Sequence, residues 1–252
     1  MIAQIQSKEV RFTAPERWLD QAINVVVLGA GGNGSEVVDC LATFHFTLLK
    51  LGHPRGLNVT VIDDAVVRES NLVRQRFWPC DIDQYKSICL VNRYNLNLGT
   101  QWKALPYRFP GEQTIFPLAN ADLVISCVDV NSARVALANY QGKLRKDAMW
   151  MDMGNGQRHG QVVFGGLTEV MRKRFPCVLD VYPEVAELAD STTKSCSAAE
   201  SINSQDCLVN RTVATAAMSL LWELIRSGST SKHWILMSLE SGEQQTHMFP
   251  EA

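Results

Sequence analysis

The 252-residue sequence lacks a surplus of charge of either sign and lacks any long apolar run. Its 24 Lys and Arg residues against 26 Asp and Glu residues give a formal net charge of −2, so we expect no nucleic-acid partner. No segment approaches the ~18 consecutive apolar residues that a membrane helix needs. The opening MIAQIQSKEVRF has no apolar stretch behind a basic start, so no signal peptide is expected. These absences predict a cytoplasmic protein without membrane contact.

Paired cysteine motifs are also missing. Seven cysteines are spread along the chain without any Cys-x-x-Cys spacing, so at least one thiol is unpaired and we expect a reducing compartment. Cys177, Cys196 and Cys207 are too far apart to supply the usual pairs of zinc ligands, and no zinc is expected. No internal repeat and no low-complexity tract is present. The length suits one large α/β domain or a domain with an appendage.

The sequence does contain an alternation of apolar runs and helical patterns. Ile23–Leu28 is apolar except at Asn24 and is rich in valine, which is typical of a strand buried on both faces of a sheet. A glycine-rich segment at 29–34 follows it, and then a helical pattern that ends near residue 51. A second apolar strand is expected at 58–62. This order of strand, glycine loop, helix and strand predicts a βαβ unit.

The later segments continue the α/β pattern. We expect strands at 103–107, 123–127, 149–153 and 161–164, helices at 132–141 and 206–226, and an edge pair of strands at 234–239 and 245–248. Residues 168–205 show little regular patterning, and loops this long are often functional. The pattern therefore predicts a doubly wound, Rossmann-like α/β fold with a mostly parallel sheet and an additional antiparallel edge. Residues 1–252 would form a single domain, with a short preface at 1–20 and a long loop at 168–205.

The glycine-rich segment is a candidate phosphate site. Gly29, Gly31, Gly32 and Gly34 would let the backbone approach a phosphate, and the following helix offers unpaired N–H groups with partial positive charge. Asp63 ends the next strand and is placed to accept hydrogen bonds from ribose hydroxyls. The alternative is a strand–helix turn that simply packs tightly. Because NAD, S-adenosylmethionine and ATP all use this geometry, the loop alone leaves the nucleotide open.

Charged residues beyond Asp63 favour phosphoryl chemistry. Asn71 and Arg74 lie in SNLVRQ, and Lys86 follows Arg74 by twelve residues. A hydride-transfer enzyme has no use for this cluster, whereas stabilising a reacting phosphoryl group requires preorganised cations. Asp129 follows the apolar strand LVISC and would be a Mg²⁺ ligand in the same crevice. Taken singly, Arg74 and Lys86 fit a solvated charged face and Asp129 fits a helix N-cap, but their order favours one site.

The motifs GAGGNG, DD…SNLVRQ…K and DLVISCVD-x-x-x-x-R together resemble the ThiF/MoeB superfamily, which includes the ubiquitin-activating enzymes. They cover residues 23–165 well and 190–226 more loosely. The LLKLGHPRGL turn and the MDMGNG…GQVVFGG segment further resemble the ThiF-like proteins of PRTRC gene systems. The resemblance implies ATP- and Mg²⁺-dependent adenylation of the C-terminal carboxylate of a small ubiquitin-like protein, with release of pyrophosphate. It also implies a homodimer and onward transfer to a thiol.

The resemblance assigns roles to the residues that match its motifs. It implies that ATP is held by Gly29, Gly31, Gly32 and Gly34, and its ribose by Asp63. It implies that the phosphates are bound by Asn71, Arg74 and Lys86, that Mg²⁺ is held by Asp129, and that the site is supported by Arg134.

Three departures from the superfamily pattern leave other functions open. The Asn that usually follows the Mg²⁺-binding Asp is Val130 here, although Asn131 comes next. The glycine of Asp-x-Gly-x-x-Lys is Asp83. The N-terminal R-Y-x-R-Q segment is absent, with Arg11 or Arg17 as substitutes for its arginine. A nucleotide-binding scaffold without catalysis and an enzyme that adenylates a non-protein carboxylate are therefore the alternatives.

Cys196 is the candidate acceptor thiol. It lies in KSCSAAE within the long loop, which resembles the crossover loop of the superfamily, where a cysteine receives the activated terminus. Such a thiol must be an exposed thiolate near positive charge, which Lys194 or a helix N-terminus would supply. The alternative is an ordinary loop thiol. Cys40, Cys89 and Cys127 are expected to be core thiols.

Overall fold

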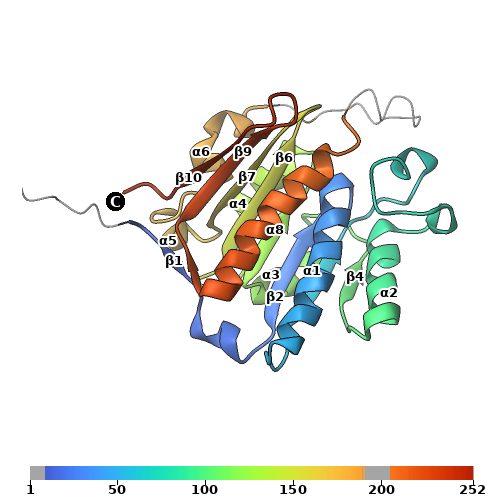
Figure 1. The fold of residues 1–252 in the computed structure, drawn as a ribbon, viewed down its shortest axis with the longest axis horizontal. Helices are drawn as coiled ribbons and strands as arrows, with labels where there is room; N and C mark the ends of the chain where they lie inside the picture. The colour runs from blue at the N-terminus through green and yellow to red at the C-terminus, as the bar shows by residue number, and fades with distance from the viewer. Residues whose placement is uncertain (1–8, 189, 191–204, 252) are drawn as a thin grey trace, which may run out of the picture.

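The structure is a computed structural model that describes residues 9–188, 190 and 205–251. An eight-stranded sheet with the order β10-β9-β7-β6-β5-β2-β3-β4 runs through the molecule (Figure 1). Its strands are β2 (Ile23–Leu28), β3 (Leu57–Ile62), β4 (Lys103–Leu105), β5 (Leu123–Ser126), β6 (Met149–Asn155), β7 (His159–Gly166), β9 (Lys232–Ser238) and β10 (Gln244–Met248). A separate two-stranded sheet pairs β1 (Phe12–Thr13) with β8 (Ser229–Thr230).

Strand direction divides the large sheet into two parts. β4, β3, β2, β5 and β6 run parallel to their neighbours, whereas β7, β9 and β10 continue the sheet in antiparallel fashion. The predicted α/β fold with a parallel sheet and an antiparallel edge is confirmed. All eight of its strands were expected, with bounds that differ from the observed ones by at most two residues at either end; the predicted strand at 103–107, for example, ends at Leu105.

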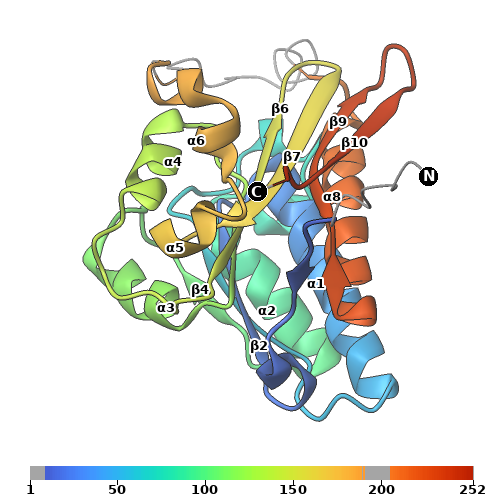
Figure 2. The ribbon, with the colours of Figure 1, turned by 90° about the vertical axis from the view of Figure 1, so that its left-hand side faces the viewer.

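Helices cover both faces of the sheet (Figure 2). One face carries α1 (Gly32–Lys50), α2 (Lys86–Leu98) and α8 (Val209–Ser227), and the other carries α3 (Ile115–Asn120), α4 (Asn131–Ala138), α5 (Glu169–Arg172) and α6 (Val178–Val181). Short 3-10 turns lie at η1 (Glu16–Leu19), η2 (Glu69–Asn71), η3 (Pro79–Asp81), η4 (Glu112–Thr114) and η5 (Pro183–Ala186). No helix among the described residues is long and apolar enough to cross a membrane.

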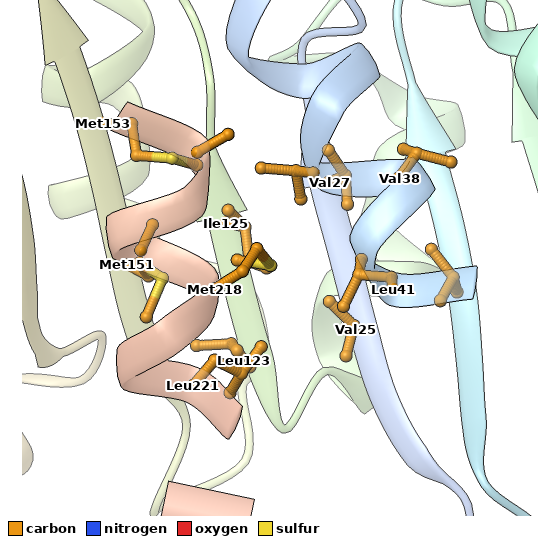
Figure 3. Packing of buried hydrophobic residues seen from close by; sticks show 14 of the residues in the cluster. Val25, Val27, Val38, Leu41, Leu123, Ile125, Met151, Met153, Met218 and Leu221 are labelled. Atoms are coloured by element: carbon orange, nitrogen blue, oxygen red, sulfur yellow. The ribbon is translucent and has the colours of Figure 1, made fainter. Parts of the chain in front are cut away.

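The two helical layers explain why residues 25–28 of β2 are all apolar. Val25 and Val27 point into the core beneath α1 and α8, whereas Val26 and Leu28 point into the core beneath α3 and α4. Figure 3 shows Val27 on β2 facing the same layer as Leu41 of α1. Because successive side chains of a strand point to opposite faces, a strand covered on both sides is apolar along its covered length; Asn24, at the amino-end edge, is the exception and pairs with Asp122 and Asn58.

The expected N-terminal preface is partly built into the core. Phe12 and Trp18 are buried, and Phe12 packs edge-on against the Phe164 ring at a centroid distance of 5.6 Å. Arg17 donates hydrogen bonds to Asp122 at 2.6 and 2.9 Å and to Asp147 at 2.6 and 2.9 Å. Both aspartates precede strands of the parallel part, so this ion cluster lies at the amino-end edge of the sheet.

The expected long loop at 168–205 is more regular in its first half than its sequence pattern predicts. It begins with α5, α6 and η5, and Phe175 and Cys177 are buried between them. One-turn helices are too short to produce a repeating apolar pattern, so periodicity could not have indicated them. Residues 191–204, in the second half, lie outside the described part of the chain.

Strand order places the switch point of the sheet at β2. The chain passes from β2 to β3 on one side, and later returns to β5 on the other side of β2. In open α/β sheets, the connections after two such strands leave in opposite directions, and ligands bind between them at the carboxyl ends. Figure 1 shows α1 and α8 side by side, both beginning at this end of the sheet.

Candidate nucleotide-binding site

The predicted glycine loop lies at the switch point, directly after β2. The loop spans residues 29–31, and α1 begins at Gly32. Gly29 has a φ of 89°, and its N–H donates to the Ile62 carbonyl at 2.9 Å. A Cβ at Gly29 would lie 2.8 Å from the Cys127 carbonyl oxygen. Gly29 is therefore required by its left-handed backbone and by the close approach of the loop to the end of β5.

The other three glycines have different surroundings. A Cβ at Gly34 would lie 1.9 Å from the Gly29 carbonyl oxygen, and a Cβ at Gly32 would lie 2.5 Å from the Asn210 side chain. A Cβ at Gly31 would meet no described atom within 4 Å. Gly31 thus faces open space at the N-terminus of α1, where the first helical N–H groups lack intrahelical acceptors. Of the four glycines, Gly31 leaves room for a phosphate.

Asp63 fastens the glycine loop to the end of β3. One carboxylate oxygen accepts the Ala30 N–H at 2.6 Å, and the other accepts the Ala65 N–H at 2.8 Å. Burial raises the pKa of the Asp63 carboxyl, and the charge of Lys86 together with these two hydrogen bonds acts against that rise. A carboxylate oxygen has two lone pairs, so Asp63 still offers acceptor capacity to a ribose hydroxyl.

Lys86 lies beside Asp63 because the chain between β3 and α2 folds back on itself. Lys86 is the first residue of α2 and is 9% exposed, and its N–H donates to the Ala65 carbonyl at 2.9 Å. The neighbouring Ser87 hydroxyl donates to the Asp63 carbonyl at 2.9 Å. Asp63 and Lys86, which were predicted from separate motifs, are therefore neighbours in space. Burial of Lys86 does not fit the alternative of a solvated charged face.

The turn before Lys86 has a left-handed backbone at Asp83, the position where the resemblance implies a glycine. Asp83 has a φ of 66°, in the left-handed region, and is the one described non-glycine residue with positive φ. Its N–H donates to the Val67 carbonyl at 3.0 Å, and its side chain is exposed. Aspartate is among the few residues that tolerate this conformation. The turn therefore has a conformation that glycine also adopts readily, although aspartate occupies it.

Replacing Asp83 by glycine is expected to stabilise the chain by about 0.5 kcal/mol, because relief of the left-handed strain slightly exceeds the added entropy of the unfolded chain. Gly99, at the other end of α2, has a φ of 68°, and a Cβ added there would meet no described atom within 4 Å, so it serves as the reverse control. Gly99→Ala should destabilise by about 1 kcal/mol. Urea unfolding measures both; a loss of stability in Asp83→Gly would mean that the side chain stabilises the turn.

Arg74 reaches the glycine loop through contacts with the segment that opens α8. Its Nη1 donates to the side-chain oxygen of Gln205 and, at 3.3 Å, to Oδ1 of Asn210. Asn210 is also the residue whose side chain lies over Gly32. The Asn71 side chain instead accepts the Arg68 N–H at 2.9 Å within η2. The Arg74 side chain is thus brought to the glycine loop. The Asn71 side chain, by contrast, bonds within η2, in the connection between β3 and α2 that carries Arg74.

Asp129 is exposed at the carboxyl end of β5. It follows Val128, whose side chain would contact a Cβ at Gly29 at 3.3 Å. The alternative role of Asp129 as an N-cap is not seen, because Val130 occupies that position of α4 without a side-chain hydrogen bond. Asp190 caps the helix instead, accepting the Ser132 N–H at 2.9 Å and its hydroxyl at 2.5 Å. The Asp129 carboxylate is therefore not used as a cap.

Arg134 supports the strand ends beneath Asp129. It is 7% exposed, and its Nε donates to both carboxylate oxygens of Asp152 at 2.9 and 3.0 Å, with Asp152 1% exposed. Its Nη2 donates to the carbonyls of Val128 at 2.8 Å and Met153 at 3.1 Å. This one side chain therefore ties the segment after β5 to β6. The described bonds of Arg134 are to protein groups, which fits a supporting role.

Of the six described thiols, two are buried, two are half-buried and two are exposed. Cys89 lies in the core, and Cys40 and Cys127 are half-buried against it, as expected. Burial raises the pKa of Cys40 and Cys89 to about 11 and also raises that of Cys127, so these thiols are poor nucleophiles at neutral pH. Cys196 lies outside the described residues. No group of three or more His, Cys, Asp or Glu side chains in the described part of the chain could hold a metal ion.

Sequence reasoning missed several residues of this region. Asn33, Asn155 and Asn210 join their side chains beside the loop, and Asp152 pairs with Arg134. Asn33 stands inside the quoted motif GAGGNG, and Asp152 and Asn155 stand inside MDMGNG, so their positions carried a signal that was not used. Nothing local distinguishes Asn210.

The sheet order and the residues at the carboxyl end of β2 define a Rossmann-like α/β protein with a glycine loop at the switch point of the sheet and charged side chains beside it. The sequence model of the ThiF family matches residues 3–249 of this chain. The chain belongs to the ThiF family. Comparison with curated protein sequences finds no match.

Solved structures share this fold at low sequence identity. PaaA is 14% identical with a TM-score of 0.60, and the alignment covers 92% of this chain and 65% of PaaA. Escherichia coli MccB with ATP is 17% identical with a TM-score of 0.61, covering 93% of this chain and 66% of MccB. The same protein with AMPCPP and MccA is 16% identical with a TM-score of 0.60. The chain thus spans slightly less than two thirds of the length of these structures.

Proposed function

We propose that the chain uses ATP and Mg²⁺ to adenylate the C-terminal carboxylate of a small ubiquitin-like protein and releases pyrophosphate. The observation that supports this most strongly is the open space at Gly31 in the N-terminal turn of α1, with Lys86 and Arg74 both brought to the same loop. Membership of the ThiF family supports the same activity. The finer resemblance to the ThiF-like proteins of PRTRC systems belongs to this proposal.

Structures of the same fold support ATP as the nucleotide. MccB has been solved with ATP, and also with AMPCPP together with MccA. In this chain, the N–H groups at Gly31, the ammonium of Lys86 and the guanidinium of Arg74 would receive the phosphates. Asp63 would accept the ribose hydroxyls. Asp129 would hold Mg²⁺, because magnesium in proteins is commonly bound by one or two carboxylates together with substrate phosphates.

The chemistry asked of these residues is charge stabilisation. A carboxylate oxygen of the protein substrate forms a bond to the α-phosphorus of ATP, and the bond from that phosphorus to the oxygen bridging to the β-phosphate breaks. Pyrophosphate leaves with the electron pair, and the acyl adenylate remains. Lys86 and Arg74 offset the charge that builds on phosphate oxygens, in a partly buried site where such contacts are strong. Mg²⁺, when bound, would withdraw further charge from those oxygens.

Two further parts of the proposal concern the transfer of the acyl group after adenylation and the assembly of the protein. Cys196 is proposed as the thiol that accepts the acyl group, because it lies in the segment that resembles the crossover loop. A homodimer is proposed from the resemblance. The N-terminal R-Y-x-R-Q segment, whose arginine the relatives use, is absent from this chain. Arg17 is paired with Asp122 and Asp147 at the amino-end edge of its own sheet, so within one chain it does not replace that arginine.

Exchange of labelled pyrophosphate into ATP tests the adenylation step. With a panel of ubiquitin-like proteins that have free C-terminal carboxylates, exchange is expected for the cognate member and is expected to disappear when its terminus is amidated. Lys86→Ala and Asp129→Ala should each reduce exchange at least about 100-fold, as is typical when one charge-stabilising group is removed. Lys103→Ala and Asp20→Ala replace exposed residues outside the crevice and should leave exchange unchanged.

The outcomes separate the alternatives. ATP binding by calorimetry without exchange would favour a nucleotide-binding scaffold, and exchange driven by a small carboxylic acid would favour a non-protein substrate. Preferential binding of NAD over ATP with Mg²⁺ would contradict the proposal altogether. Full exchange activity in Asp129→Ala would remove Asp129 from the mechanism.

A further inference from the structure

Three asparagine side chains from distant parts of the sequence meet beside the glycine loop. Asn33 lies in the first turn of α1, Asn155 ends β6, and Asn210 lies in the first turn of α8. Asn33 and Asn210 are 6% and 4% exposed. Hydrogen bonds of 2.9 to 3.3 Å join their amides. We call these three residues the amide cluster.

The hydrogen bonds within the amide cluster fix the orientation of Asn210. Its Nδ2 donates to Oδ1 of Asn33 at 3.0 Å and to Oδ1 of Asn155 at 3.3 Å, and Asn33 donates its own Nδ2 to Asn155 at 2.9 Å. A turn of the Asn210 amide by half a revolution would bring its oxygen against two acceptor oxygens, which is unfavourable. Oδ1 of Asn210 therefore stays free of the cluster, and it accepts the Arg74 guanidinium at 3.3 Å.

Asn210 also lies directly on the glycine loop. A Cβ at Gly32 would come within 2.5 Å of the Asn210 side chain, so glycine at this position makes room for the amide. Asn210 thus contacts both the first turn of α1 and Arg74. This contact brings the guanidinium close to the helix N-terminus where Gly31 faces open space.

Arg74 needs such an anchor because of the segment that carries it. The connection from β3 to α2 contains two short 3-10 turns and one isolated bridge as its described regular structure. An arginine side chain loses much rotamer freedom when it is fixed, and a fixed cation stabilises phosphate charge better than a mobile one. A neutral amide fixes the guanidinium without cancelling its charge. A carboxylate at the same position would compete with the phosphate.

We propose that Asn210 is a positioning residue that holds the Arg74 guanidinium at the N-terminus of α1 as a prearranged partner for a nucleotide phosphate. The amide cluster fixes the orientation of Asn210, which then holds the Arg74 guanidinium together with the side-chain oxygen of Gln205. The inference rests on the proposed function, since it assigns a role within the same nucleotide site.

A double-mutant cycle with two ligands tests the inference. Calorimetry would measure binding of AMPCPP with Mg²⁺, which carries phosphates, and of adenosine, which carries none. Asn210→Ala should weaken AMPCPP binding about tenfold, the usual effect of losing one charge-assisted contact, and should leave adenosine binding unchanged. In an Arg74→Ala background, Asn210→Ala should have no further effect on AMPCPP. Equal losses for both ligands, or additive losses in the double variant, would overturn the inference.

Two further variants keep the test decisive. Asn58→Ala removes another amide pair, in which Asn58 donates to Asn24 at 2.8 Å at the amino-end edge of the sheet, and it should not change AMPCPP binding. Asn210→Asp keeps the packing over Gly32 but sets a carboxylate against Arg74, so it should weaken AMPCPP at least as much as alanine does. Absence of AMPCPP binding by the unchanged chain would overturn the proposed function and the inference with it. Normal binding in both Asn210 variants would overturn the inference alone.

Discussion

Gly34→Ala is expected to destabilise the fold by about 3 kcal/mol. Gly31→Ala is expected to change the free energy of unfolding by at most about 1 kcal/mol, but to weaken ATP binding at least tenfold. The contrast arises from the atoms that a new Cβ would meet. At Gly34 it would lie 1.9 Å from a backbone carbonyl oxygen, and at Gly31 it would meet no described atom within 4 Å. Backbone cannot move aside as a flexible side chain can, so α1 must shift in the Gly34 variant.

The Gly31 variant tests a different property of the loop. Its φ of −78° is negative, so an added Cβ does not meet the left-handed strain that it would meet at Gly29, where φ is 89°. The added methyl group would instead occupy space that a phosphate must enter to reach the helical N–H groups. The expected signature is a nearly normal unfolding midpoint together with weak ATP binding.

Urea unfolding and calorimetry with ATP and Mg²⁺ measure the two effects. Gly156→Ala is the matched control, because a Cβ there also meets no described atom within 4 Å and Gly156 lies in the β6–β7 hairpin rather than in the loop. It should change neither quantity appreciably. Normal ATP binding in Gly31→Ala would show that phosphate does not approach the loop at this residue.

The glycine loop shows how far sequence reasoning reaches. The strand before it, the helix after it and the second strand are all predictable, because burial on both faces of the sheet leaves an unbroken apolar run at 25–28. The separate reasons for the four glycines are not predictable. Gly32 is next to Asn210 and Gly34 is next to Gly29, and a residue 178 positions away in the chain has no signature in the loop itself.

The polar residues of the site follow the same rule. The position of Asp63 at a strand end follows from the sequence, but its bonds to the Ala30 and Ala65 N–H groups depend on how the loop folds over it. Lys86 could be read as a surface cation until the turn at Asp83 is seen to fold it back toward Asp63. The amide cluster joins three elements that only tertiary packing brings together. Local patterns specify elements and their order, whereas contacts between elements determine what each polar side chain does.

Asparagine at Asp152 is expected to destabilise the fold by about 3 to 5 kcal/mol, because it leaves the buried charge of Arg134 without its counterion. Both side chains are less than one tenth exposed, and Nε of Arg134 contacts both carboxylate oxygens. Asp152 also accepts the Ser126 hydroxyl, which in turn accepts the Trp150 indole N–H at 2.6 Å. The loss of one charge therefore disturbs a connected buried network.

The double variant Arg134→Met with Asp152→Leu distinguishes an unpaired charge from a loss of packing. Removing both charges should be less destabilising than Asp152→Asn alone, because no ion is left without a partner. Glu169→Gln is the surface control: it breaks the i,i+4 pair with Lys173, in which both side chains are largely exposed, and should change stability by at most about 0.5 kcal/mol. Urea unfolding of the three variants supplies the comparison.

The same variants reveal whether the ion pair serves the site. Arg134 holds the carbonyls of Val128 and Met153, so its loss should loosen the segment that carries Asp129. In the double variant, Mg²⁺-dependent strengthening of ATP binding should therefore fall, while ATP binding without Mg²⁺ stays closer to normal. If both kinds of binding fall equally, Arg134 supports the whole crevice rather than the end of β5. The contrary outcome is that Asp152→Asn unfolds at the same urea concentration as the unchanged chain. In that case the carbonyls of Val128 and Met153 are sufficient to hold the Arg134 guanidinium, and the Asp152 carboxylate is not its essential partner.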